Sequence, residues 1–211
     1  MSPLTSEKYN VAWFKLAEFV KRGEKERALG MYRLLSYSLT DAALSSQLEG
    51  DLLLSFRDEK ALESYVRAAL LYEQQDKLNH TIAIYEHLIT LIPENNSFAC
   101  KLITLYEHAD REKVLKIVMR FVDLRLAESI EALDQFLSEL QVSTEYIFII
   151  HEYIVLKLLD KAMPFEVVKK YINKAMQAAY SETHVINFIA QISELSSEAR
   201  VYASQFKEAK K

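Results

Sequence analysis

The sequence predicts an all-α fold, an antiparallel helix-pair solenoid with about eleven or twelve helices. Three observations predict it. Glycine and proline each occur only three times in 211 residues. Apolar residues recur at spacings of three and four along almost the whole chain. A pattern of small and aromatic residues also returns after 33 residues in the N-terminal half. Together they indicate one helical domain over residues 1–211.

The shortage of glycine and proline argues against folds that depend on tight turns. β-Hairpins and glycine-rich nucleotide-binding loops need residues that adopt positive φ, and three glycines supply too few of them. Half of the residues are apolar and 27% are charged, which is typical of a globular protein. We therefore do not expect a sandwich, a barrel or a glycine-rich nucleotide fold.

Turn and capping residues divide the apolar stripes into helices. Serine, threonine and aspartate can accept hydrogen bonds from the free N–H groups at a helix start, and proline cannot continue a helix. In the first half of the chain, the predicted helix boundaries are Gly23 after the first helix, Thr40 and Asp41 capping the third, residues 57–59 beginning the fourth, and Asp76 and Lys77 before the fifth. Further along, Pro93 ends the fifth helix and residues 108–110 begin the seventh. Later helices begin at Ser143, Pro164 and Ser181.

Two segments are harder to assign. The apolar positions from Leu115 to Leu140 keep one helical phase, so residues 111–140 form either one long helix or two. Residues 146–150 are aromatic and β-branched, which favours a strand. Ile147, Ile150 and Ile154 nevertheless keep helical spacing, and no partner strand is evident. We predict a helix there, the most buried one of the C-terminal half.

The internal repeat is carried by small and aromatic residues. Three pairs of residues lie 33 apart: Ala17 and Gly50, Ala28 and Ala61, Tyr32 and Tyr65. We expect the small residues to let the two helices of a repeat approach closely. We expect each tyrosine to fill the space between successive repeats.

These residues resemble the signature of the tetratricopeptide repeat over residues 10–93. Seven residues of the first repeat match it by type: Trp13, Leu16, Ala17, Val20, Ala28, Tyr32 and Leu35. The resemblance implies a right-handed superhelix whose concave groove is lined by the first helix of each pair and holds a peptide or a partner domain. The helix at 59–75 could be the second helix of one repeat or the first of the next. Residues 94–211 either continue degenerate repeats or form a helical cap.

The repeat register places eight residues in the groove: Val11, Phe14, Glu18, Lys21, Leu44, Gln47, Asp51 and Leu54. Tetratricopeptide proteins that grip acidic chaperone tails use a lysine and asparagines at such positions. Here Phe14, Glu18, Gln47 and Asp51 stand there, so that clamp is not expected. We expect an apolar groove with an acidic lining, suited to an extended or helical ligand with apolar anchors and positive charge. Alternatively, these side chains only cover the next helix.

Charge, apolar stretches and cysteine content indicate which classes of partner and which location to expect. The net charge is −4, and the basic residues do not cluster apart from Lys207, Lys210 and Lys211, so nucleic-acid binding is not expected. The most apolar stretch, residues 146–159, is interrupted by charged residues and is too short to span a membrane. The polar N-terminus does not resemble a signal peptide. Cys100 is the single cysteine, so no internal disulfide can form, which suits a reducing compartment such as the cytoplasm. Its apolar neighbours predict a buried thiol.

No catalytic residue, metal site or cofactor is predicted. The five histidines lack the H-x-x-x-H spacing of a helical zinc site. His80 and His87 lie two turns apart on one face, and we interpret them as surface or capping residues. No nucleophile elbow or phosphate-binding loop occurs, so the protein is not expected to be an enzyme.

The function expected is an interaction scaffold or adaptor that binds a partner protein or peptide in the groove. One form is a dedicated chaperone similar to the small tetratricopeptide chaperones of bacterial secretion systems. Two alternatives stay open: a regulatory sensor that binds a peptide or small molecule, and a structural subunit of a larger helical complex.

Overall fold

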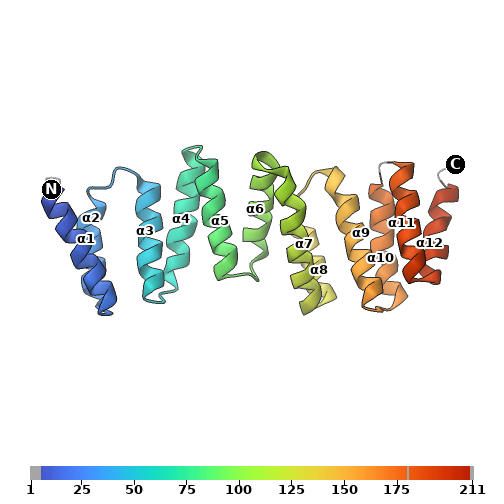
Figure 1. Cartoon of the computed structure of the whole chain (residues 1–211), viewed down its shortest axis with the longest axis horizontal. Coiled ribbons are helices and arrows are strands. Elements are labelled where there is room, and N and C mark those ends of the chain that lie inside the picture. The colour runs from blue at the N-terminus through green and yellow to red at the C-terminus, as the bar shows by residue number, and fades with distance from the viewer. Residues whose placement is uncertain (1–5, 180, 210–211) are drawn as a thin grey trace. The chain divides into compact units, whose positions relative to one another are not determined.

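The computed structural model describes residues 6–179 and 181–209, and within them every regular element is a helix (Figure 1). The helices are α1 (Ser6–Lys21), α2 (Lys25–Ser36), α3 (Ala42–Ser55), α4 (Lys60–Gln74), α5 (Leu78–Leu91), α6 (Asn96–Ala109), α7 (Arg111–Glu128), α8 (Ile130–Glu139), α9 (Thr144–Asp160), α10 (Phe165–Ala178), α11 (Glu182–Leu195) and α12 (Ser197–Ala209). The predicted all-α class and the number of helices are confirmed.

Several helix ends follow the predicted capping chemistry. The Asp41 carboxylate accepts hydrogen bonds from the backbone N–H groups of Ala43 and Leu44, at 2.9 and 3.3 Å, at the start of α3. The Ser181 hydroxyl accepts one from the N–H of His184, at 3.2 Å, at the start of α11. After α1, Gly23 adopts a φ of 72°, which glycine reaches without a steric penalty. These three boundaries are therefore fixed by local residues, as predicted.

Two predicted helix starts differ in detail. Ser143 precedes α9, but its side chain accepts no capping hydrogen bond. Its backbone N–H instead donates to the Glu107 carboxylate at 2.8 Å, so the predicted side-chain cap is wrong. Pro164 lies immediately before α10 rather than in its first turn, because its ψ of 136° is not helical.

The segment 111–140 forms two helices. Ser129 between α7 and α8 has an extended backbone, with φ −168° and ψ 168°. Its hydroxyl accepts a hydrogen bond from the N–H of Ala132 at 3.0 Å, so it caps α8. Residues 146–150 lie within α9, as predicted. Among the described residues, α9 buries more side chains than α7, α8, α10 or α11 does: Tyr146, Phe148, Ile150, His151, Ile154, Val155 and Leu158.

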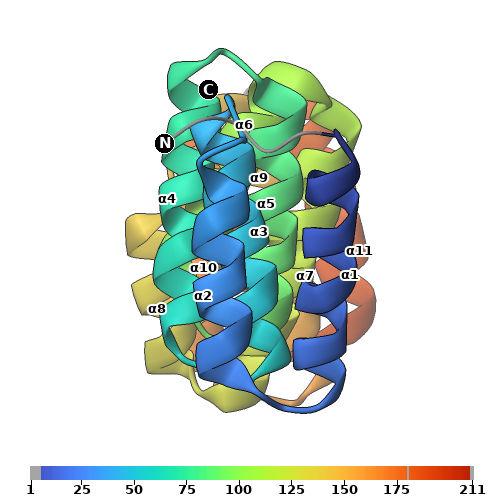
Figure 2. The same ribbon diagram turned by 90° about the vertical axis from the view of Figure 1, so that its left-hand side faces the viewer.

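The contacts divide the chain into two compact units, residues 1–98 and 99–211. In the N-terminal unit, α1 packs on α2, α3 on α4, and α4 on α5, and successive helices run antiparallel (Figure 2). The contact between α2 and α3 is much smaller than the contact between α3 and α4. Because α4 packs on both α3 and α5, it can be read as the second helix of one repeat or as the first helix of the next.

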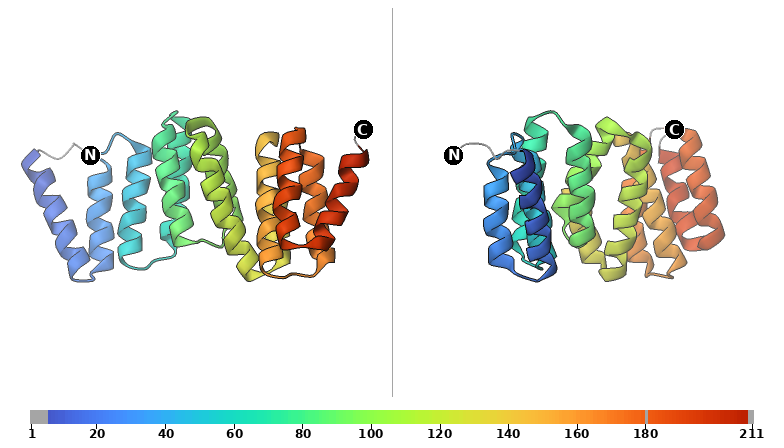
Figure 3. Two further views of the ribbon diagram at one scale, coloured as in Figure 1. Left: turned by 45° about the vertical axis from the view of Figure 1, so that its right-hand side comes forward. Right: turned by 60° about the vertical axis from the view of Figure 1, so that its left-hand side comes forward.

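In the C-terminal unit, α9, α10, α11 and α12 form a group of four helices (Figure 3). In this group, α9 packs on α10 and α11, and α12 packs on the same two helices. Helix α7 packs on α8 and α9. The core contains fully buried aromatic side chains: Phe121, Phe136, Phe148, Tyr171 and Phe188.

The residues of the 33-residue repeat differ in what they contact. Ala28 and Ala61 are buried, and a Cβ on Gly50 would lie 2.9 Å from the ring of Tyr65, so the close approach predicted at Gly50 is confirmed. Ala17 is exposed, so the same role predicted for it is wrong. Tyr32 of α2 is buried, and its hydroxyl lies 2.9 Å from the Ser45 hydroxyl of α3, which links the first helix pair to the next.

Candidate functional site

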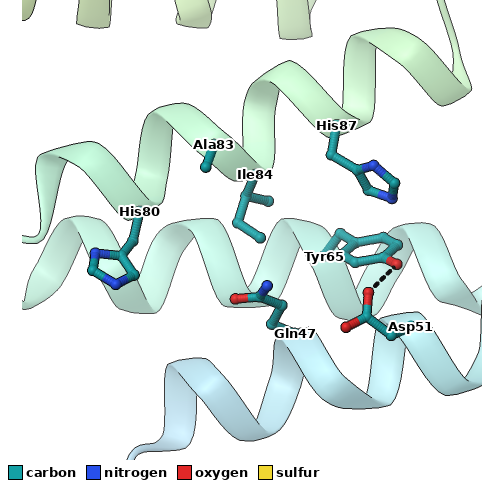
Figure 4. A pocket seen from close by; sticks show the side chains of 7 residues that line it. All are labelled: Gln47, Asp51, Tyr65, His80, Ala83, Ile84 and His87. Carbon is teal, nitrogen blue, oxygen red and sulfur yellow. Dashed lines mark hydrogen bonds between the residues drawn. The ribbon is translucent and has the colours of Figure 1, made fainter.

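A pocket of about 290 Å³ opens between α3, α4 and α5 in the N-terminal unit (Figure 4). Two polar side chains come from α3, one tyrosine comes from α4, and α5 contributes two histidines and two apolar residues. The lining residues are Gln47, Asp51, Tyr65, His80, Ala83, Ile84 and His87. Because α4 packs on both α3 and α5, Tyr65 lies between the side chains of the two outer helices.

Helical spacing brings these side chains together. Gln47 and Asp51 are four residues apart, so they occupy one face of α3. His80, Ile84 and His87 follow at spacings of four and three along α5, so they share the face that looks toward α3 across Tyr65. The pocket is therefore polar along α3 and mixed aromatic and apolar along α5.

Asp51 is the charged group of the pocket. The hydroxyl of Tyr65 donates a hydrogen bond to its Oδ1 at 2.6 Å. No described residue forms an ion pair with this carboxylate, whereas Glu49, two residues earlier, pairs with Arg67. Asp51 is exposed, and one oxygen is oriented by Tyr65. The carboxylate therefore keeps the capacity to accept hydrogen bonds from a cation.

Gln47 is oriented by a second tyrosine of α4. The hydroxyl of Tyr72 donates to Oε1 of Gln47 at 3.0 Å. This contact assigns the amide oxygen to Tyr72, so the NH₂ group is the part of the amide that can donate to a ligand. The pocket thus combines a fixed acceptor, Asp51, with a neighbouring donor.

The two histidines contact the tyrosines of α4. The ring of His87 meets the ring of Tyr65 edge-on, with centroids 4.7 Å apart and an interplanar angle of 72°. Its Nε2 is buried and has no hydrogen-bond partner among the described residues. The interpretation of His87 as a surface or capping residue is therefore wrong. His80 is exposed, and its ring lies 4.9 Å from that of Tyr72.

Tyr65 stays a hydrogen-bond donor over a wide pH range. Burial raises the pKa of its hydroxyl well above its usual range, and the hydrogen bond to Asp51 raises this pKa further. Burial also raises the pKa of Tyr72. Both hydroxyls therefore remain protonated at neutral pH and hold Asp51 and Gln47 in their orientations.

Only two of the eight predicted groove residues, Gln47 and Asp51, line this pocket. On α1, Val11 and Phe14 are exposed, as are Glu18 and Lys21, and Glu18 pairs with Arg22. On α3, Leu44 is exposed and Leu54 is half-buried.

Sequence reasoning missed the contributions of α4 and α5. The repeat predicts Tyr65 only in the space between repeats, and it does not connect the histidines with α3. The signal that could have found them is the spacing of His80 and His87, which repeats along α5 in the way that Gln47 and Asp51 repeat along α3.

Among residues 6–179 and 181–209, no three histidine, cysteine or acidic side chains gather as metal ligands would. None of the helices described has both the length and the apolar character needed to cross a bilayer. Cys100 is half-buried, and burial raises the pKa of its thiol to about 11, so the thiol is protonated at neutral pH.

Compared with known proteins, the sequence matches no protein-family model and no curated protein.

Proposed function

We propose that the protein is an interaction scaffold whose N-terminal unit holds a segment of a partner protein that carries a lysine or arginine side chain. The observation that carries this proposal is the Asp51 carboxylate. It faces the pocket, is oriented by Tyr65, and forms no ion pair with any described residue. A cation from a partner would supply the missing countercharge.

The rest of the pocket suits a long basic side chain. An ammonium or guanidinium group can donate to the free lone pairs of Asp51, and charge-assisted hydrogen bonds are stronger than neutral ones. The aliphatic stem of the same side chain can pack on Ile84 and on the aromatic rings of Tyr65 and His87. The site therefore favours lysine or arginine over a small cation.

Features beside the pocket favour a peptide rather than an isolated amine. The NH₂ group of Gln47 is placed to donate to a backbone carbonyl of an extended chain. Leu44 lies three residues before Gln47, and Leu54 lies three residues after Asp51, so both continue the same face of α3. These leucines offer apolar contacts to the residues that flank the basic one.

The repeat supports a scaffold of tetratricopeptide type. The 33-residue interval relates two helix pairs, α1–α2 and α3–α4, and the tyrosines at its equivalent positions, Tyr32 and Tyr65, are both buried. In this proposal α3 and α5 act as first helices that present side chains to the ligand, and α4 supports them from behind. Repeat modules of this kind hold peptides on extended surfaces.

Selection from a random peptide library displayed on phage tests the proposal with the full chain as bait. We expect the enriched peptides to share a lysine or arginine next to an apolar residue. Asp51→Asn keeps an acceptor for Tyr65 but removes the charge, and it should weaken binding about tenfold or more. The matched control is Glu63→Gln, an exposed position on α4 outside the pocket, which should bind unchanged. Enriched peptides without a basic residue, or equal binding to Asp51→Asn, would contradict the proposal.

A further inference from the structure

A second pocket, of about 370 Å³, lies within the C-terminal unit between α8, α9 and α10. Its lining residues are Leu137, Ile147, His151, Lys174, Gln177 and Ala178. Its volume falls in the range of small-ligand sites, about 300–1,000 Å³. Its chemistry is opposite to that of the first pocket, because its charged residue is a lysine.

His151 contributes a buried and unused hydrogen-bond acceptor. The side chain is only 8% exposed. Its Nδ1 lies 2.8 Å from the carbonyl oxygen of Ile147, and a carbonyl only accepts, so Nδ1 carries the proton and donates. In the neutral ring, Nε2 is then an acceptor, and it has no hydrogen-bond partner among the described residues. Leaving such a group buried and unpaired has a free-energy cost.

The neutral form of His151 is favoured by its surroundings. Burial lowers the pKa of the ring, and the positive charge of Lys174 lowers it further, against the opposing hydrogen bond to Ile147. A ligand group that meets Nε2 must therefore bring an N–H or O–H donor.

Lys174 contributes an unpaired positive charge. It is half-buried, with Nζ 5.9 Å from the centroid of the Tyr171 ring, and it forms no ion pair with any described residue. The Asp134 carboxylate interacts electrostatically with Lys174, but both of its oxygens have other partners. Oδ1 of Asp134 accepts from the Tyr171 hydroxyl at 3.0 Å, and Oδ2 pairs with Lys170. Lys174 therefore remains able to bind an anion.

The remaining lining defines the shape of the ligand. Leu137 and Ile147 are half-buried apolar side chains on one side, and Gln177 is an exposed amide on α10, three residues after Lys174. A carboxylate on Lys174 can therefore take a second hydrogen bond from Gln177, while an apolar arm lies against Leu137 and Ile147.

We propose that this pocket binds a carboxylate ligand that has a hydrogen-bond donor beside the carboxylate and a short apolar arm. Lys174 and Gln177 hold the carboxylate, and Nε2 of His151 accepts from the donor. Because Nε2 is covered by its neighbours, the contact requires a small shift of the pocket wall. The same chemistry occurs in a free hydroxy acid and in an acidic residue of a peptide.

Nuclear magnetic resonance of the full chain tests this proposal. The ring C–H signals of His151, assigned with His151→Gln, are followed at neutral pH during titration with four probes. Hydroxyisocaproate carries the carboxylate, the donor and the apolar arm. Isocaproate lacks the hydroxyl, and isocaproamide lacks both the hydroxyl and the charge, so it is compared with isocaproate. The blocked dipeptide acetyl-Leu-Glu-amide carries the same groups on a peptide.

We expect hydroxyisocaproate or the dipeptide to shift the His151 signals with saturation. The dissociation constant should rise about three- to tenfold for isocaproate, and isocaproamide should not bind. Lys174→Met should weaken binding about tenfold, whereas Lys161→Met, an exposed lysine after α9, should leave it unchanged. Tighter binding of hydroxyisocaproate identifies the ligand as a free acid, and tighter binding of the dipeptide identifies it as a peptide.

Two results would overturn the proposal. One is that neither hydroxyisocaproate nor the dipeptide binds. The other is that Lys174→Met binds the effective probe as tightly as the unchanged protein while its thermal unfolding shows an intact fold. Neither result bears on the N-terminal pocket, because these probes and variants do not involve Asp51.

Discussion

Gly50 and Tyr65 approach so closely that a methyl group on Gly50 would lie 2.9 Å from two carbons of the Tyr65 ring. The ring has little freedom to withdraw, because its hydroxyl is bonded to Asp51 and the ring makes a T-shaped contact with the ring of His87. Gly50 is therefore required by the packing of α3 on α4, and the same contact sets the position of the pocket tyrosine.

Replacing this glycine should destabilise the protein. Gly50→Ala should lower the free energy of unfolding by about 1–3 kcal/mol, since overpacking outweighs the better helix propensity of alanine. Gly30→Ala in α2 is the matched control, because a Cβ there meets nothing within 4 Å. That variant should gain about 0.5–1 kcal/mol. Urea unfolding measures both, and a stabilised Gly50→Ala would refute the close contact.

Asp41 should stabilise the N-terminal unit in a way that is lost in acid. It caps α3, and its hydrogen bond from Lys77 Nζ, at 2.6 Å, lowers its pKa to about 2. The folded pKa lies below the unfolded value near 4, so the contribution is present above about pH 4 and disappears as the pH falls toward about 2.

Unfolding of Asp41→Ala in urea at neutral pH should show a loss of about 1–2 kcal/mol. The loss should be smaller for Asp41→Asn, which keeps the cap. Asp110→Ala is the control, because Asp110 precedes α7 without making a side-chain cap. An equal loss at Asp110 would show that capping is not the cause.

Two tyrosines bonded to aspartates should make the protein sensitive to alkali. Burial raises the pKa of both Tyr65 and Tyr171 well above the usual range, and hydrogen bonds to Asp51 and Asp134 add to the effect. The folded pKa exceeds the unfolded value near 10, so this stability is present below about pH 10 and falls as the pH rises above it.

Tyr65→Phe and Tyr171→Phe should each lower stability by about 1–2 kcal/mol at neutral pH and flatten the decline in alkali. Tyr37→Phe should change neither property, because Tyr37 is 75% exposed. Unfolding measured across alkaline pH, together with the ultraviolet absorbance of tyrosinate, checks this. A decline equally steep in both variants would speak against it.

His151 should reduce stability in mildly acidic solution. Its pKa is lowered by burial in the folded state, so the unfolded chain takes up the proton first as the pH falls below about 6.5. Stability should therefore decrease from neutral pH toward about pH 5. His151→Phe should remove this dependence, whereas His108→Gln, at an exposed position of α6, should retain it. Thermal unfolding as a function of pH gives the answer, and an unchanged slope in His151→Phe would exclude this histidine as the source.

A helix boundary can be predicted from the sequence where a single residue ends or caps the helix through its own backbone or side chain. Asp41 and Gly23 act on the backbone beside them, so their effect does not depend on the rest of the fold. The break at Ser129 could not be decided, because Leu126, Ile130 and Leu133 keep an apolar phase that one long helix would also show. Ala17 shows a related difficulty, because a small residue permits a close neighbour but does not reveal whether one is present.

The candidate site shows the same division. Gln47 and Asp51 could be predicted because the repeat interval assigns their helix face. The roles of Tyr65 and His87 depend on α5 packing on α4, which is a tertiary relationship. The second pocket likewise depends on α8, α9 and α10 lying together. No residue spacing in the sequence indicates that these three helices do so.

The small contact between α2 and α3 has a consequence for local unfolding. Since α1 and α2 contact each other far more than α2 contacts α3, they can separate from the rest of the N-terminal unit at a modest cost. The hydroxyl contacts of Tyr32 with Ser45 are among the links that this separation would break. We expect the amide hydrogens of α1 and α2 to exchange with deuterium sooner than those of α3 and α4, so this helix pair would behave as a separate cooperative element.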